Sequence, residues 1–180
     1  MSVDPHELRA RLTADVRERI MRENWHSHDA RWFLKVGVEC GFDVANRLNQ
    51  STLRSMAKTE MRRLIDASGC GPIETTEDLA KVLGLAMEVY FPPPMLEGEA
   101  EAVDESSARG TVTRCLVHEE VTKAGVQGLY ECACPYRHLG WLEACGYSGK
   151  VEILKSMLRG DPVCEFAITE LSRLPDEKPR

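Results

Sequence analysis

The chain of 180 residues is long enough for one domain with a sizeable core, and its 43% hydrophobic and 29% charged residues are ordinary for a soluble protein. A formal net charge of -6, with acids and bases interspersed, argues against a nucleic-acid binder, which usually shows a basic stripe. No stretch approaches the roughly 20 apolar residues of a membrane helix, and the polar, acidic N-terminus is unlike a secretory signal. We therefore expect a cytoplasmic protein with no nucleic-acid or membrane partner.

Helical patterns fill the first half of the chain. The segment Asp4-Pro5 has the signature of a helix start, and apolar residues follow at every fourth position: Leu8, Leu12, Val16 and Ile20. We expect this helix to lie on the surface or to pair with a second subunit in a two-fold homodimer. Further helices are predicted over 27–40, over 42–67, and from Thr75 or Thr76 to Tyr90, before the break at residues 92–94.

Shorter patterns follow that break. Strands are predicted over 99–103, 111–114, 150–158 and 163–171, and short helices over 116–124 and from Pro135 to Gly146. The expected fold class is α+β, with N-terminal helices packed on a C-terminal antiparallel sheet that carries two short helices. We expect a single domain over 1–174, with a helical part at 4–91, a sheet part at 97–171, and a frayed tail at 175–180.

The third predicted helix carries polar groups inside its apolar arc, where Asn46, Asn49 and Glu60 fall. Basic residues occupy the other side: Arg47, Arg54, Lys58 and Arg62. Buried polar groups must be satisfied or functional. Glu60 should therefore pair with a cation, for which Arg31 and Arg63 are candidates, or have its pKa raised.

The segment W-H-S-H-D-A-R-W-F of the second predicted helix offers a possible catalytic base. His28 could be a ligand or general base that Asp29 orients, or the segment could be an aromatic core anchor with Ser27 as the helix cap. We predict that His28 and Glu60 face a common cavity, with Trp32 beside it and ligand-binding amides on its wall from Asn46 and Asn49.

Cysteines concentrate between Cys115 and Cys164, where five of the seven lie. In a reducing compartment such clusters favour metal binding or catalysis over disulfides. Three alternatives stay open: a metal site, buried core cysteines, or a nucleophile, for which Cys134 is the candidate because the helix at Pro135 would lower its pKa. The candidate metal ligands, with zinc as the expected ion, are Cys115, His118, Cys132, Cys134, Cys145 and Cys164.

These motifs support a resemblance to a known family. The segments R-C, C-P and L-R-G-D-P-V-C-E-F, with W-H-S-H-D-A-R-W-F and G-F-D-V-A-N-R-L-N, resemble the L-2-amino-thiazoline-4-carboxylate hydrolase-like proteins and their uncharacterised bacterial and archaeal relatives. That group is in turn similar to 4-vinyl-reductase domains, which bind small ligands and can hold zinc through cysteines. The resemblance implies a compact, often dimeric α+β domain, and a match for two of the zinc cysteines at Cys145 and Cys164.

Two functions from different classes follow from these observations. The first is a small-molecule hydrolase acting on a nitrogen- or sulfur-containing metabolite, with catalytic residues His28, Asp29, Glu60 and Cys134; the resemblance implies that it opens a cyclic C–N bond. The alternative is a non-catalytic sensor or carrier module that binds a metal or a small ligand. The enzyme requires a polar pocket, whereas the module requires an apolar pocket and a closed metal site.

Overall fold

The computed structural model describes residues 4–175, whose contacts divide the chain into two compact units, Met1–Ala45 and Asn46–Arg180. The predicted frayed tail at 175–180 lies, apart from its first residue, outside the described residues.

The first unit consists of α1 (Pro5–Ala10), α2 (Ala14–Cys40) and the start of the next helix. Asp4 caps α1, as predicted, by accepting a hydrogen bond from the His6 amide at 2.9 Å. The prediction of one helix through Ile20 is wrong, because Thr13 caps a new helix by accepting from the Val16 amide at 3.3 Å. The predicted helix start at Ser27 is also wrong, since α2 continues through it and ends at Cys40, with Gly41 as its C-cap.

The second unit begins within α3 (Phe42–Ser68) and continues into α4 (Thr76–Tyr90). Both helices match the predicted ranges closely. The start of α4 is fixed by a capping box, in which Thr75 and Asp78 each bind the other's backbone amide. The apolar stripe of α4 is buried and includes Leu79, Leu83 and Ala86.

The sheet has four antiparallel strands in the order β1-β2-β4-β3. Their ranges are β1 (Leu96–Asp104), β2 (Ser107–Cys115), β3 (Tyr147–Lys155) and β4 (Cys164–Arg173). Two helices, α5 (Leu116–Lys123) and α6 (Cys134–Ala144), connect β2 to β3, and the 3-10 turn η1 (Met157–Arg159) precedes β4. The predicted α+β class, with N-terminal helices and a C-terminal antiparallel sheet, is confirmed.

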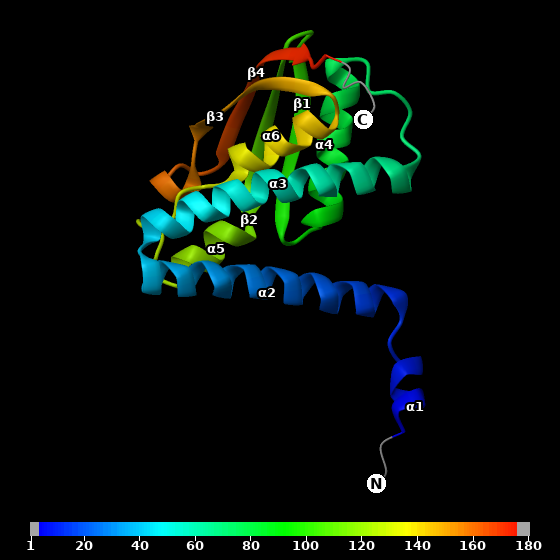
Figure 1. The fold of residues 1–180 in the computed structure, drawn as a ribbon, viewed down its shortest axis with the longest axis vertical. Coiled ribbons are helices and arrows are strands. Elements are labelled where there is room, and N and C mark those ends of the chain that lie inside the picture. The colour runs from blue at the N-terminus through cyan, green and yellow to red at the C-terminus, as the bar shows by residue number, and fades with distance from the viewer. Residues whose placement is uncertain (1–3, 176–180) are drawn as a thin grey trace. The chain divides into compact units, whose positions relative to one another are not determined.

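One hydrophobic core joins α3, α4 and α6 to the inner face of the sheet. Trp141 and Leu142 of α6 pack there with Phe166 and Ile168 of β4. Helix α6 runs alongside α3 (Figure 1), and Gly140 permits this approach, because a Cβ atom there would lie 2.4 Å from the Arg54 carbonyl oxygen. The contact between α3 and α6 positions the ion pairs and the surface hollow described below.

Candidate functional site

A buried ion pair connects α3 to α6. Arg137 Nη1 donates to Glu60 Oε1 at 2.6 Å, and Trp141 Nε1 donates to Glu60 Oε2 at 3.0 Å. Both carboxylate oxygens therefore have a partner, as a buried carboxylate requires. The predicted burial of Glu60 is confirmed, but its cation is Arg137 and neither Arg31 nor Arg63.

The surroundings of this ion pair hold it in place. The Arg137 guanidinium lies over the Phe91 ring at 4.8 Å from its centroid, and the Tyr90 hydroxyl donates to the Glu60 carbonyl oxygen at 2.7 Å. Sequence reasoning missed Arg137 because a charged residue in a short helix gives no sign of burial. The signal that could have found it was the requirement of Glu60 for a cation.

The two asparagines of α3 are buried, as the apolar arc predicted. Asn46 bridges to the segment before α6: its Nδ2 donates to the Leu129 carbonyl oxygen at 2.8 Å, and its Oδ1 accepts from the Glu131 amide at 3.0 Å. Through these two hydrogen bonds, the Asn46 side chain holds the loop that precedes α6. A ligand-binding role for Asn46 and Asn49 stays a prediction.

The histidine candidate belongs to the other unit. His28 is exposed on α2, Asp29 is half-buried, and Trp32 is 36% exposed. The buried aromatic residue of this stretch is instead Phe33, whose ring packs on Phe42 with centroids 5.9 Å apart. The cavity predicted to hold both His28 and Glu60 stays a prediction, because the two residues lie in separate units.

Four thiols gather where β2, β4 and the start of α6 meet: Cys115, Cys132, Cys134 and Cys164. A hydrogen bond between Cys132 and Cys134 lowers the pKa of the Cys132 thiol and raises that of Cys134. The prediction that the α6 N-terminus lowers the pKa of Cys134 is therefore wrong, because the thiol partner outweighs it. Burial raises the pKa of Cys115 to about 12.

Cys145 lies apart from this thiol cluster. It is buried, and its interacting thiol is Cys70; burial raises its pKa to about 12. Among residues 4–175 no group of three or more His, Cys, Asp or Glu side chains is arranged to hold a metal ion. The expected metal-binding, zinc-containing protein is therefore contradicted: the six proposed ligands divide into separate groups, and two thiols bind each other.

His138 is a buried polar residue that sequence reasoning did not select. Its Nδ1 lies 2.9 Å from the Cys134 carbonyl oxygen, and its ring contacts Trp141 and Phe166. Its Nε2 has no hydrogen-bond partner in the described part of the chain. Burial lowers the pKa of His138 to about 4, so the imidazole is neutral at pH 7.

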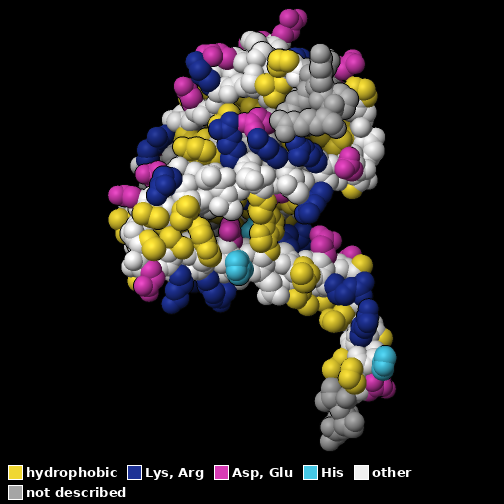
Figure 2. Space-filling view, viewed as in Figure 1, with side chains coloured by type: hydrophobic (Ala, Val, Ile, Leu, Met, Phe, Trp, Pro, Cys, Tyr) yellow, Lys and Arg dark blue, Asp and Glu magenta, His cyan; other side chains and the backbone are white. Residues whose placement is uncertain are grey.

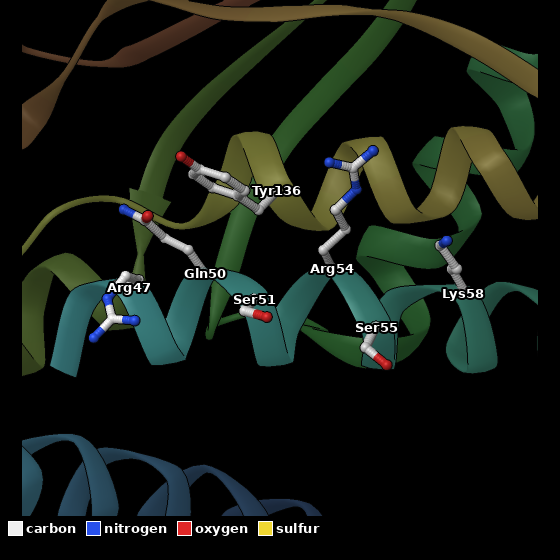
Figure 3. Close-up of a pocket in the computed structure, with 7 residues that line it drawn as sticks. All are labelled: Arg47, Gln50, Ser51, Arg54, Ser55, Lys58 and Tyr136. Atoms are coloured by element: carbon white, nitrogen blue, oxygen red, sulfur yellow. The ribbon is translucent and has the colours of Figure 1, made fainter. Parts of the chain in front are cut away.

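A basic hollow of about 490 Å³ lies between α3 and α6, and we call it the α3–α6 hollow. Figure 3 shows Gln50, Arg54 and Lys58 projecting from α3 toward α6, where Tyr136 stands on the opposite wall. The other lining residues, Arg47, Ser51 and Ser55, come from α3. The predicted basic face of α3 thus lines a surface recess, which the sequence pattern gave no reason to expect.

Glu143 of α6 is the acidic neighbour of the α3–α6 hollow. Its carboxylate pairs with both Arg54 and Lys58, and the Arg54 Nε atom donates to it at 3.0 Å. Burial raises the pKa of Glu143, but the hydrogen bonds from Lys58 and Arg54 outweigh this and hold the pKa below its usual range. One carboxylate is therefore shared by two cations on α3.

Comparison with known proteins shows a likeness in fold to a solved structure. No known family and no curated relative matches the sequence. Among solved structures, the fold is similar to trafficking protein particle complex subunit 3 from Naegleria fowleri, covalently bound to palmitic acid, with a TM-score of 0.61 and 14% identity. The match covers 90% of this chain and 99% of that one. At this identity, the likeness shows a shared fold.

This likeness bears on the expected function. The similar structure is a subunit of a protein complex, and the expectation of a small-molecule hydrolase is contradicted by it. The resemblance to the hydrolase-like family stays a prediction. None of the helices within residues 4–175 combines the length and the hydropathy of a membrane span.

Proposed function

We propose that this chain is a non-catalytic subunit that works by assembling with partner proteins. The observation that carries the proposal is helix α2, which has 27 residues and buries only Phe33 and Gly37. Isolated helices are marginal in water, and most helical stability in proteins comes from packing an apolar face. A helix of this length with so little buried surface therefore calls for a partner.

The exposed apolar residues of α2 support the same conclusion. Val38 is 76% exposed and Met21 is 69% exposed, and Trp32 and Ile20 are also exposed. Tryptophan and methionine are enriched in protein interfaces. Met21 and Trp32 lie within about 20° of each other around the helix, so they present one surface to a partner.

The similar structure supports assembly as the kind of function. Its description names a subunit of a trafficking complex, and the shared fold extends over nearly its whole length. A role for this chain in trafficking rests on that likeness in fold alone. A two-fold homodimer through α2 is the alternative form of the same proposal, since two copies would cover each other's exposed residues.

The experiment compares the tagged chain in its own cells with the purified chain. Size exclusion with light scattering should give a mass well above the 20.2 kDa of one chain for the cellular form, with stoichiometric partners identified by mass spectrometry. Twice the single-chain mass for the purified protein would identify the homodimer. A single-chain mass in both samples would contradict the proposal.

Paired charge variants locate the interface on α2. The double variant Met21→Glu/Trp32→Glu should dissociate the assembly, because a partner would have to bury two charges. The matched control is Arg19→Glu with Ala30→Glu, which places two glutamates on the opposite side of the same helix, where both residues are exposed. Equal loss of assembly in both pairs would argue against a defined α2 interface.

A further inference from the structure

The α3–α6 hollow concentrates positive charge on a chain whose net charge is -6. Its seven lining residues include Arg47, Arg54 and Lys58 and no acid. Figure 2 shows Lys and Arg side chains gathered in a row along this part of the surface. Within the described residues Arg47 has no ion-pair or hydrogen-bond partner, and the other two cations share one carboxylate.

We propose that the α3–α6 hollow binds an acidic segment of a partner protein. This inference rests on the proposed function, because it names the chemistry of a partner. Electrostatic complementarity of this kind selects partners and fixes their register more than it adds affinity.

Glu143 shows which anion the hollow accepts. Its carboxylate binds Arg54 and Lys58 together, so these two cations are already arranged around the functional group of an aspartate or glutamate. The carboxylate occupies this position from the chain's own helix α6. An incoming acidic side chain must therefore share or displace it, which makes Glu143 a competitor of the partner.

The walls of the hollow favour a peptide over a small molecule. Small-molecule sites are enclosed and mostly apolar, whereas Arg54, Ser51, Ser55 and Tyr136 are all exposed and three of these four are polar or charged residues of α3. Such an open, polar recess can admit a chain that enters at one end and leaves at the other.

The spacing of the cations fits an extended chain. Arg54 and Lys58 are one helical turn apart, about 6 Å along α3, and alternate side chains of an extended peptide are about 7 Å apart. The distance from Arg47 to Lys58 along the helix is about 16 Å, which about five extended residues span. In the matching partner segment, the two acidic residues that face Arg54 and Lys58 therefore lie at alternate positions.

The test measures binding of a fluorescent peptide of alternating glutamate and serine to the full chain by anisotropy at low salt. Saturable binding is expected, and Arg54→Gln should weaken it about fivefold, the upper end of the effect of one charged contact at an exposed site. Glu143→Gln should strengthen binding by a similar factor, because it removes the competing carboxylate. General charge attraction would give effects of the same two signs, so the size of the effect at the hollow must be compared with that of a charge change outside it.

Two controls separate the hollow from general charge. Arg62→Gln removes an exposed cation of α3 that does not line the hollow, and it should leave affinity within about twofold. A peptide with glutamine in place of glutamate should not bind. Equal losses for Arg54→Gln and Arg62→Gln, no gain for Glu143→Gln, or tighter binding of inorganic pyrophosphate than of the peptide would overturn the proposal. None of these results depends on assembly through α2, so the two proposals fail separately.

Discussion

Helices α3 and α6 carry two ion-pair sites that differ in burial and in the direction of charge. In the first, α3 supplies the carboxylate of Glu60 and α6 supplies the guanidinium of Arg137, with side chains 6% and 9% exposed. In the second, α6 supplies the Glu143 carboxylate, which is 21% exposed, and α3 supplies Arg54 and Lys58, which are 46% and 39% exposed. The same two helices thus hold one buried ion pair and one partly exposed group of one carboxylate and two cations.

This difference determines what each site can do. A buried pair is costly to break, because the remaining charge cannot return to water, so it fixes the helices without being free to bind anything else. An exposed pair contributes little to stability, and its members can exchange one partner for another. We therefore assign Glu60 and Arg137 to the framework, and Arg54 and Lys58 to recognition.

The largest expected effect comes from breaking the buried pair. Glu60→Gln leaves the Arg137 guanidinium buried without a counter-charge, and the free energy of unfolding should fall by about 3–5 kcal/mol. Chemical denaturation followed by circular dichroism measures this change. The same substitution at Glu77, whose pair with Lys81 is exposed, should cost no more than about 0.5 kcal/mol.

A double variant distinguishes the lost charge from the lost shape. Glu60→Gln combined with Arg137→Met removes both charges and retains an amide oxygen for Trp141 Nε1. Stability should return most of the way toward wild type, because no buried charge is left unpaired. A double variant as unstable as Glu60→Gln alone would show that the pair is not what makes Glu60 important.

The second effect is a pH dependence that comes from His138, the buried neighbour of Trp141. The His138 imidazole titrates near 6.5 when exposed and at about 4 when buried in the fold. Between these values the unfolded state binds one more proton, so the free energy of unfolding should fall by about 3 kcal/mol as the pH drops through this range. The Glu143 pKa is held below 4.5, so its contribution is present above that pH and is lost only as the pH falls below it.

Substitution of His138 tests this assignment. His138→Gln removes the titrating group, so stability measured from pH 7 to pH 4.5 should lose most of its slope. His6→Gln, at an exposed histidine, should leave the slope unchanged. If the His138 variant retained the wild-type slope, another group would be responsible.

The third effect acts on the contact that both sites share. Gly140→Ala would place a Cβ atom 2.4 Å from the Arg54 carbonyl oxygen, so α6 must move away from α3. We expect a loss of about 1–3 kcal/mol in the free energy of unfolding. Gly84→Ala is the control: this helical glycine has open space at its Cβ position, and the change should stabilise by about 0.4–1 kcal/mol.

Local sequence patterns predicted the helices and the buried positions well, but they did not predict which distant side chains contact each other. Apolar periodicity predicted α3 and the burial of Asn46 and Glu60, and capping residues predicted the start of α4. Local patterns could not indicate that Arg137 is the counter-charge of Glu60, because that contact depends on how two distant helices pack. The split at Thr13 was missed because an apolar stripe continues through a helix break without a change in its period.

The thiols show the same limit. Sequence density placed five cysteines in one stretch, but the structure puts Cys145 with Cys70 and gathers the others where strand and helix ends meet. Spacing along the chain does not report these distances. The contrast between framework and recognition sites likewise appears only when burial is known.

The smallest expected effect on stability comes from the exposed ion-pair site at Glu143. Glu143→Gln makes the same chemical change as Glu60→Gln between the same two helices, but the cations it leaves behind are exposed and can be hydrated. The free energy of unfolding should fall by no more than about 1 kcal/mol, and this loss should shrink further in high salt, where exposed pairs are screened. Denaturation at two salt concentrations measures both. A loss of 3 kcal/mol or more would mean that Arg54 and Lys58 belong to the framework, and they could not then be exchanged to a partner without unfolding the contact that holds them.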